Sequence, residues 1–214
     1  DLISKDTALS MRVLRMANSA FVSSEQKIED VFTPVQMLGL QRVNIMTHTL
    51  FMMRDARQQT GMDWRHLWIH AIATAAIADE IEKQLGQPVG RQLYLAALLH
   101  DVGKIVLSTV APEAYRVIMD MAWANEGRFD ALEDACFGLG HSDAGVVFAQ
   151  HNGLPDETVA AIAHHANPGA ATAHGLTVAV VSLANYFGKF YGLGFSGARL
   201  DETDGDLETQ PGWE

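Results

Sequence analysis

Histidines are the residues of this 214-residue sequence whose type and spacing could do chemistry, since the chain contains nine of them. His66 and His70 stand four positions apart in a segment with helical spacing, so both should project from one helix face. An alanine- and isoleucine-rich run follows His70, which predicts a helix buried nearly all round. We therefore expect His70 in the interior, with His66 either a further ligand beside it or a partly exposed neighbour.

A histidine–aspartate doublet, His100-Asp101, ends a second apolar run at residues 95–99. An ionised aspartate buried there would cost several kcal/mol unless it is paired or binds a metal ion. A histidine pair, His164-His165, ends a third apolar run at residues 159–163. Three apolar helices therefore each place an imidazole in or beside the core, and one shared cation would satisfy them all.

Imidazole nitrogens suit iron, manganese, zinc or nickel, and a carboxylate can bridge two such ions. With His141, these residues offer enough ligands for two divalent ions, which at about 3.5–4 Å apart can activate a water molecule and hold a phosphoryl group. Lys104, one turn after His100, could neutralise phosphate oxygens. The alternative for His100-Asp101 is a buried ion pair or a helix-end cap. A single core histidine is also more often bonded to a backbone carbonyl than to a metal.

The elements that position these residues are helices, because glycine and proline punctuate long stretches of helical spacing without a convincing alternating strand. The predicted fold class is all-α. A lapse in helical patterning at 57–63 predicts an N-terminal helical lobe at 1–58 and a larger helical core at 62–195. An acidic tail follows at 196–214. The expected helices cover residues 6–21, 31–38, 40–57, 63–85, 89–110, 112–125, 129–137, 142–152, 156–165 and 175–191.

The bulk composition limits the classes of function. A formal net charge of −11 repels phosphate backbones, so non-specific nucleic-acid binding is not expected. The longest apolar runs stop short of the roughly 20 residues of a membrane span, so no membrane contact is expected. A single cysteine, Cys136, and the lack of a secretory pattern predict a reducing, cytoplasmic location. The chain lacks an initiator methionine and is expected to be part of a longer polypeptide.

The segment HDVGK at residues 100–104 resembles the signature of the HD superfamily of metal-dependent phosphohydrolases. His70 resembles that family's leading histidine, His141 the start of its HxxxG helix, and His164-His165 its paired histidines. The sequence is more similar still to the HDOD branch, the HD-related output domain of bacterial signalling proteins, over residues 3–193. Four segments carry this similarity: LRMANSA at 14–20, VQMLG at 35–39, FGLGH at 137–141 and NGLP at 152–155.

The resemblance implies an HDOD domain at residues 1–195, in which 62–195 form an HD-like helical core. It also implies a divalent-metal site for iron, manganese, zinc or nickel, with up to two ions. The implied ligands are His70, His100, Asp101, His141, His164, His165 and Asn185, and His66 is a further candidate from its spacing to His70. Asn185 stands where hydrolytic relatives have an aspartate, and a neutral amide is the weaker ligand. The segment ANPG at 166–169 stands where cyclic-dinucleotide phosphodiesterases have Gly-Tyr-Pro.

These departures favour a signal-transduction domain that is non-catalytic and keeps a metal pocket. Its expected partner is a signalling protein or a small nucleotide-like molecule. The alternative is a metal-dependent phosphohydrolase that acts on a nucleotide or cyclic nucleotide. In that case Asp101 and Lys104 would be the catalytic residues.

Overall fold

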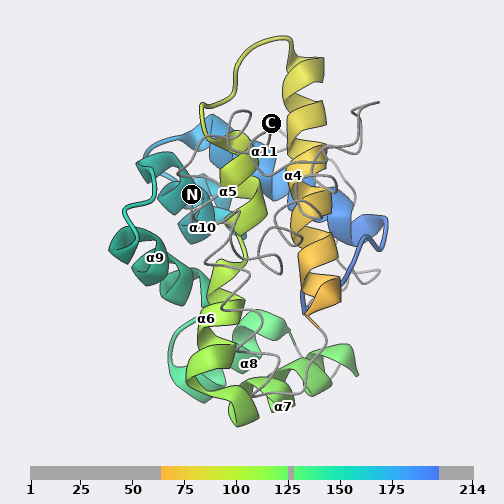
Figure 1. The fold of residues 1–214 in the computed structure, drawn as a ribbon, viewed down its shortest axis with the longest axis vertical. Helices are drawn as coiled ribbons and strands as arrows, with labels where there is room; N and C mark the ends of the chain where they lie inside the picture. The colour runs from red at the N-terminus through yellow and green to blue at the C-terminus, as the bar shows by residue number, and fades with distance from the viewer. Residues whose placement is uncertain (1–63, 125–127, 198–214) are drawn as a thin grey trace, which may run out of the picture. The chain divides into compact units, whose positions relative to one another are not determined.

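The computed structural model describes residues 64–124 and 128–197. The chain divides into two compact units, Asp1–Arg54 and Asp55–Glu214, and the described residues belong to the second. Every regular element among them is a helix, which confirms the predicted all-α class (Figure 1). The predicted N-terminal lobe and its three helices, and the tail beyond residue 197, lie outside the described residues. The helices are α4 Arg65–Leu85, α5 Leu93–Leu99, α6 Val102–Val110, α7 Pro112–Trp123, α8 Phe129–Phe137, α9 His141–His151, α10 Asp156–His164, the 3₁₀ turn η1 Pro168–Ala170, and α11 Gly175–Phe190.

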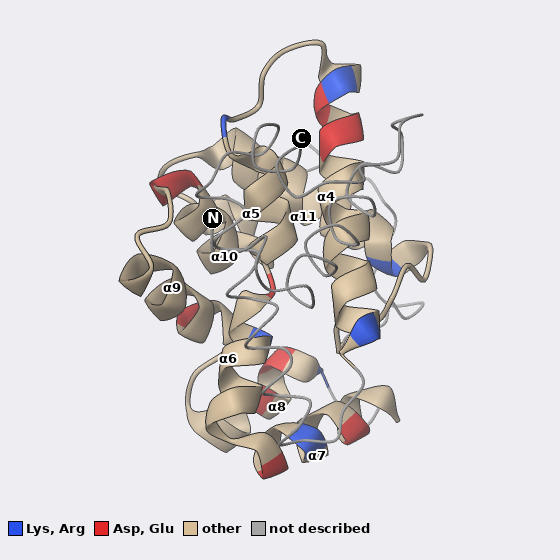
Figure 2. Cartoon of the chain, viewed as in Figure 1, with Lys and Arg blue, Asp and Glu red and all other residues tan. Residues whose placement is uncertain are grey.

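The central helix of this unit is α5, which packs against α4, α10 and α11. Its sequence, LYLAALL, has no charged residue, and six of its seven residues are buried. A short helix that is apolar all round is stable only when neighbours cover every face. Figure 2 shows the complementary distribution, with charged residues along α4, α7 and α8 and none on α5. In the other half of the unit α6 packs against α9 and α7, and α7 against α8.

The helix ends follow the punctuation of the sequence. Gly86 and Gly138 end α4 and α8 in the left-handed conformation, with φ of 65° and 68°, where a side chain would be strained. Pro112 is the first residue of α7, a position that needs no backbone donor. The bounds of α4 and α7 to α11 fall within two residues of the expected ones. The turn η1 was not expected.

One expected element differs from the structure. The sequence predicts a single helix over 89–110, but the structure has two, α5 and α6, separated at His100 and Asp101. Asp101 has φ −101° and ψ 13°, outside the helical range. The apolar pattern runs on through both helices, and neither a proline nor a glycine marks the break. Periodicity alone therefore could not locate the junction, which places the two polar residues between two apolar segments.

The same stretch is the one candidate membrane span among the described residues. Leu93–Val110 is long and apolar enough by length and composition, with a mean hydropathy of 1.4, and 78% of it is buried inside the protein. Buried core helices pass the same test. Here the stretch is broken at its middle and contains Asp101 and Lys104, so we interpret it as the core of this unit.

Candidate metal centre

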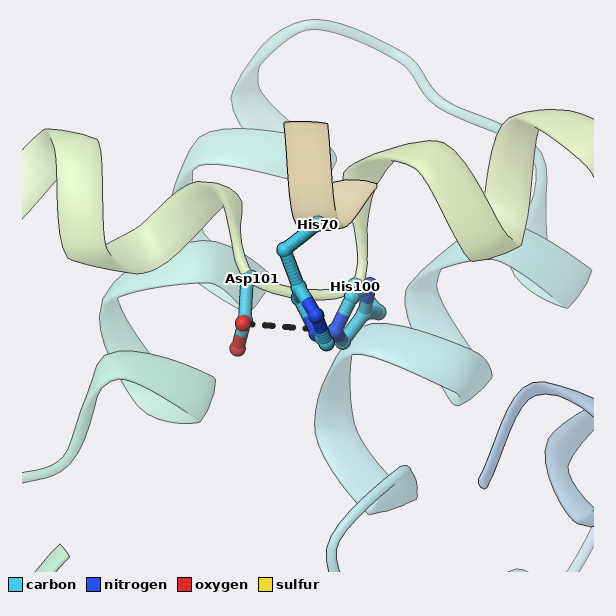
Figure 3. Close-up of side chains that lie close together, drawn as sticks. All are labelled: His70, His100 and Asp101. Carbon is cyan, nitrogen blue, oxygen red and sulfur yellow. Dashed lines mark ion pairs between the residues drawn. The ribbon is translucent and has the colours of Figure 1, made fainter. Parts of the chain in front are cut away.

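Three helices bring imidazole rings to the α5–α6 junction, which itself contains His100. His70 comes from α4, His141 is the first residue of α9, and His165 follows the last residue of α10. The ring of His100 lies 5.5 Å from that of His70 and 5.0 Å from that of His165, centroid to centroid. Figure 3 shows the rings of His70 and His100 together, with the carboxylate of Asp101 facing His100. The junction therefore gathers residues that are far apart in the sequence.

A close approach of α6 and α9 makes this gathering possible. A methyl group on Gly103 would overlap the carbonyl oxygen of His141 and would lie 2.7 Å from the backbone nitrogen of Gly145. A methyl group on Gly145 would lie 2.7 Å from a side-chain carbon of Ile162. At Gly103 a side chain would require movement of the backbone, whereas at Gly145 the side chain of Ile162 would have to move. The contact brings the first turn of α9, and with it His141, up to Asp101.

The carboxylate of Asp101 is the hub of the cluster. Its Oδ2 lies 3.3 Å from Nε2 of His100, and its Oδ1 lies 3.4 Å from Nε2 of His141 and 3.5 Å from Nε2 of His165. The ammonium of Lys104 lies 2.7 Å from Oδ1 as an ion pair, although the atoms do not have the angles of a hydrogen bond. Asp101 is 3% exposed and His100 0%. The hub is thus enclosed and surrounded by nitrogen atoms.

Hydrogen bonds at the far side of each ring fix which nitrogen faces the hub. Nδ1 of His100 lies 2.7 Å from the carbonyl oxygen of Ala97, and Nδ1 of His165 lies 3.1 Å from that of Ile162. A carbonyl oxygen only accepts, so each Nδ1 carries the proton and donates it. In a neutral ring Nε2 then presents a lone pair toward the oxygens of Asp101. Lone pairs that face each other in a buried site call for a cation between them.

Burial keeps two of the rings neutral. It lowers the pKa of His70 to about 3, with His100 adding to the shift. Burial likewise lowers the pKa of His165 to about 4, although the nearby Asp101 opposes the shift. Neutral imidazole is the form that binds a metal ion. At neutral pH both rings are therefore in the state that a metal site requires.

The charges of the centre also leave room for a cation. Burial works to raise the pKa of the Asp101 carboxyl, but the neighbouring charges, led by that of Lys104, outweigh it and hold that pKa well below its usual value. A second carboxylate, that of Glu133, is fully buried next to His141. Among the buried side chains around the hub, two carboxylates thus face one ammonium. A divalent ion would supply the missing positive charge.

The donor atoms fit such an ion. Nε2 of His100, Nε2 of His141 and both oxygens of Asp101 are buried without a hydrogen-bond partner among the described residues. Two groups of three donors lie with their atoms within 4.8 Å of one another, and Asp101 belongs to both. Nitrogen and carboxylate donors in this mixture suit zinc, iron, manganese and nickel. The two groups are His70, His100 and Asp101, and then Asp101, His141 and His165.

Three other residues expected at the site lie around this cluster. Nε2 of His70 is 2.9 Å from Oδ1 of Asn185, a buried residue of α11, so the amide contacts a ring of the cluster. His164 is half-buried and belongs to neither donor group, because its neighbour His165 takes the inward position. His66 is exposed, with its ring 6.5 Å from that of Trp123. The structure therefore brings Asn185 to the cluster but leaves His66 and His164 outside both groups.

Sequence reasoning missed two residues that the structure places behind His141. Glu133 of α8 contacts the ring of His141, and Tyr115 of α7 donates a hydrogen bond to Glu133. Glu133 lies in the middle of an amphipathic helix, and its burial is known only from the structure. Eight residues separate it from His141 across the end of a helix, so no periodic spacing connects them.

Comparison with known proteins agrees with this architecture. The family model described as HDOD domain matches residues 1–168. A crystal structure of an HDOD domain protein of unknown function from Geobacter sulfurreducens is 26% identical, with a TM-score of 0.76. The match covers 100% of this chain and 72% of that one. A protein from Marinobacter aquaeolei VT8, proposed to act in signal transduction, is 21% identical with a TM-score of 0.68. The match covers 100% of this chain and 48% of that one, and at that identity the likeness concerns the fold alone.

An uncharacterized protein from Treponema pallidum (strain Nichols) is 26% identical over 191 residues. The aligned region is 88% of this chain but 37% of that protein. The chain thus spans little more than a third of the length of this curated relative.

Proposed function

The chain belongs to the HDOD family, and we propose that it is a non-catalytic regulatory domain that keeps a divalent-metal pocket. The observation that carries this proposal is the enclosure of the pocket. His70, His100, Asp101 and His165 are each 0 to 3% exposed. A hydrolase must admit a phosphoester to its metal ions, whereas these side chains have almost no exposed surface. A pocket closed in this way suits an ion that stabilises and orients helices.

The residues that would hold an ion are the two donor groups that share Asp101. A bound ion would supply positive charge and would join helices α4, α9 and α10 to the α5–α6 junction. His100 and His165 present Nε2 toward it because backbone carbonyls fix their Nδ1 protons. His70 and His165 stay neutral through burial. These hydrogen bonds keep the metal-binding nitrogen atoms oriented toward the pocket before an ion binds.

The asparagine at position 185 supports the proposal that the domain is non-catalytic. It stands where the resemblance places an aspartate in hydrolytic relatives, and its side-chain oxygen lies 2.9 Å from Nε2 of His70. An amide carries no charge, so the site has one negative ligand fewer than a full hydrolytic set. Fewer anionic ligands weaken the binding of a second divalent ion. We therefore expect one tightly bound divalent ion.

A metal-dependent phosphohydrolase is the second candidate, and one observation favours it. Asp101 belongs to both donor groups, as a carboxylate does when it bridges the two ions of a hydrolytic centre. In that case Asp101 would hold both ions. Lys104, whose ammonium lies 2.7 Å from Oδ1 of Asp101, would balance the charge of the reacting phosphate. Its substrate would be a nucleotide or a cyclic nucleotide.

A turnover assay separates the two candidates. Purified protein is incubated with manganese or iron(II) and p-nitrophenyl phosphate, and separately with a cyclic dinucleotide. The regulatory proposal predicts no turnover above that of the D101A variant. Turnover that depends on added metal and disappears in D101A and H100A would establish the hydrolase instead.

The regulatory function also needs a binding partner, and we propose a signalling protein or a small nucleotide-like ligand. The net charge of −11 disfavours extended nucleic acids. A thermal-shift series with mono- and dinucleotides tests the small-molecule half of this proposal. A stabilisation that saturates with concentration is the expected result for a ligand, and a flat series would leave the protein partner as the candidate.

A further inference from the structure

A buried carboxylate behind His141 is the feature that the proposed function does not use. Glu133 is 0% exposed and accepts three hydrogen bonds. Its Oε2 lies 2.6 Å from Nδ1 of His141 and 2.8 Å from the backbone nitrogen of the same residue. Its Oε1 lies 3.0 Å from the hydroxyl of Tyr115. Within the described part of the chain, the donors to Glu133 belong to two residues, Tyr115 and His141, and His141 faces Asp101.

We propose that Glu133 is a positioning residue for the metal pocket, which orients His141 toward Asp101 and is itself held by Tyr115. The inference rests on the metal pocket of the proposed function. It assigns to the site a relay of three helices, in which Tyr115 of α7 contacts Glu133 of α8, and Glu133 contacts His141 of α9.

The first step of the argument is the direction of the hydrogen bonds. A carboxylate only accepts, so Nδ1 of His141 carries a proton and points it at Glu133. Nε2 of His141 then faces Oδ1 of Asp101 at 3.4 Å, and it is buried with no hydrogen-bond partner in the described part of the chain. Glu133 also binds the backbone nitrogen of His141, so it fixes both the ring and the start of α9. Rotation of the ring would break the short contact.

The second step is the rigidity of the support. Tyr115 is fully buried, and its ring stacks on Trp64 and Phe137 at centroid distances of 6.3 and 6.4 Å. Burial, reinforced by Glu133, raises the pKa of Tyr115 well above its usual value. Its hydroxyl therefore stays protonated and donates to Glu133. A phenol packed in this way holds the carboxylate at a fixed distance from the histidine.

The third step is the effect on a ligand. A carboxylate that accepts from the far nitrogen of a metal-binding histidine makes the near nitrogen a stronger donor, and loss of such a partner typically costs about 10–100-fold in metal affinity. Among the buried histidines of the two donor groups, His100 and His165 bond to neutral carbonyls, whereas His141 bonds to a carboxylate. His141 is thus the ring whose donor strength Glu133 raises.

The test uses two variants with matched controls. E133Q keeps the shape of the side chain and removes its charge, and E157Q is its control. Glu157 is also buried and accepts from one backbone nitrogen, that of Gln92, and one hydroxyl, that of Thr177, and neither of these donors is an imidazole. Y115F removes only the hydroxyl that holds Glu133. Y94F is its control, because the buried hydroxyl of Tyr94 has no hydrogen-bond partner among the described residues.

Two readouts are taken. Nitrogen-15 NMR of the metal-free full chain reports whether Nδ1 of His141 carries a proton, and titration with zinc or manganese reports metal affinity. We expect a protonated Nδ1 in the wild type, with a shift that changes in E133Q and Y115F but not in the controls. Metal affinity should fall about 10–100-fold in E133Q. It should fall less in Y115F, and stay within about twofold in E157Q and Y94F.

An unprotonated Nδ1 of His141 in the wild-type protein would overturn the proposal. An E133Q protein with the metal affinity of the wild type would overturn it as well. The NMR measurement on the wild type needs no variant, so it decides the matter even if E133Q does not fold. It also needs no metal. A chain that binds no ion but shows the protonated Nδ1 would refute the metal pocket and keep the positioning contact, so the two failures are distinguishable.

Discussion

Replacing Lys104 with methionine removes the buried ammonium that lies beside Asp101. Its ammonium lies 2.7 Å from Oδ1 of Asp101, and the two side chains are 4% and 3% exposed. The same ammonium lies 5.1 Å from the centroid of the Phe129 ring. Methionine has nearly the same length and fills the same apolar surroundings. The K104M variant therefore removes the charge while leaving most of the packing in place.

The expected loss of stability follows from the distance and the burial. At 2.7 Å and an effective dielectric constant of about 20, the attraction between the two charges is about 6 kcal/mol. The desolvation of the ammonium, which the variant avoids, offsets part of this attraction. Removal of one partner from a buried pair typically costs about 3–5 kcal/mol, because the other charge stays buried. For a unit of this size such a loss lowers the melting temperature by roughly 10 °C.

Denaturant unfolding with a metal chelator present measures this loss. The control is K83M, because Lys83 pairs with Glu80 at 3.4 Å on the surface, with side chains 64% and 56% exposed. An exposed pair of this kind contributes at most about 1 kcal/mol. In K104M a saturating divalent ion should restore more stability than it adds to the wild type, since it replaces the missing positive charge. A loss in K104M no larger than in K83M would refute the assignment of Lys104 as the partner of Asp101.

Three further predictions concern single residues of the cluster and its support. N185D adds a carboxylate beside the α4 histidine and should tighten metal binding about tenfold by calorimetry; an unchanged affinity would remove Asn185 from the ligand positions. H165A should lower metal affinity at least about tenfold, whereas H164A should change it less than about threefold; equal losses would contradict the inward position of His165. G103A forces α6 away from α9 and should lower the free energy of unfolding by about 2–4 kcal/mol in chemical denaturation. G175A should be near neutral, because a methyl group there meets no atom within 4 Å. Similar values for the two variants would refute the close approach of α6 and α9.

Much of the helical architecture can be predicted from the sequence, because glycine and proline end several helices where the chain must turn. Gly86 and Pro112 are examples, and the expected bounds near them agree with the structure. The junction at residues 100–101 could not be predicted in the same way. The apolar pattern continues on both sides because both helices are buried. A helix that is apolar on all sides has no polar face whose change of direction would reveal a break.

The residues of the candidate metal centre also fall into those that the sequence predicts and those that it does not. The histidines at the ends of apolar runs were recognisable, because a polar residue there must find a partner in the core. Whether His164 or His165 faces inward depends on how the last turn of the helix is rotated about its axis. A difference of one residue decides it, and sequence patterns locate helix ends least accurately. Lys104 was recognised as a cation that could neutralise phosphate oxygens, whereas its ion pair with Asp101 follows from the structure alone. Glu133 was not recognisable, since its contact with His141 arises from the packing of α8 against the start of α9.

The measurement that tests the metal pocket most directly is an anomalous diffraction map of crystals grown with zinc or manganese, recorded at the absorption edge of the metal. We predict a peak between the carboxylate of Asp101 and the rings around it, and its loss in D101A crystals grown in the same way. Crystals of the wild-type protein that contain saturating metal and show no peak at Asp101 would contradict the account.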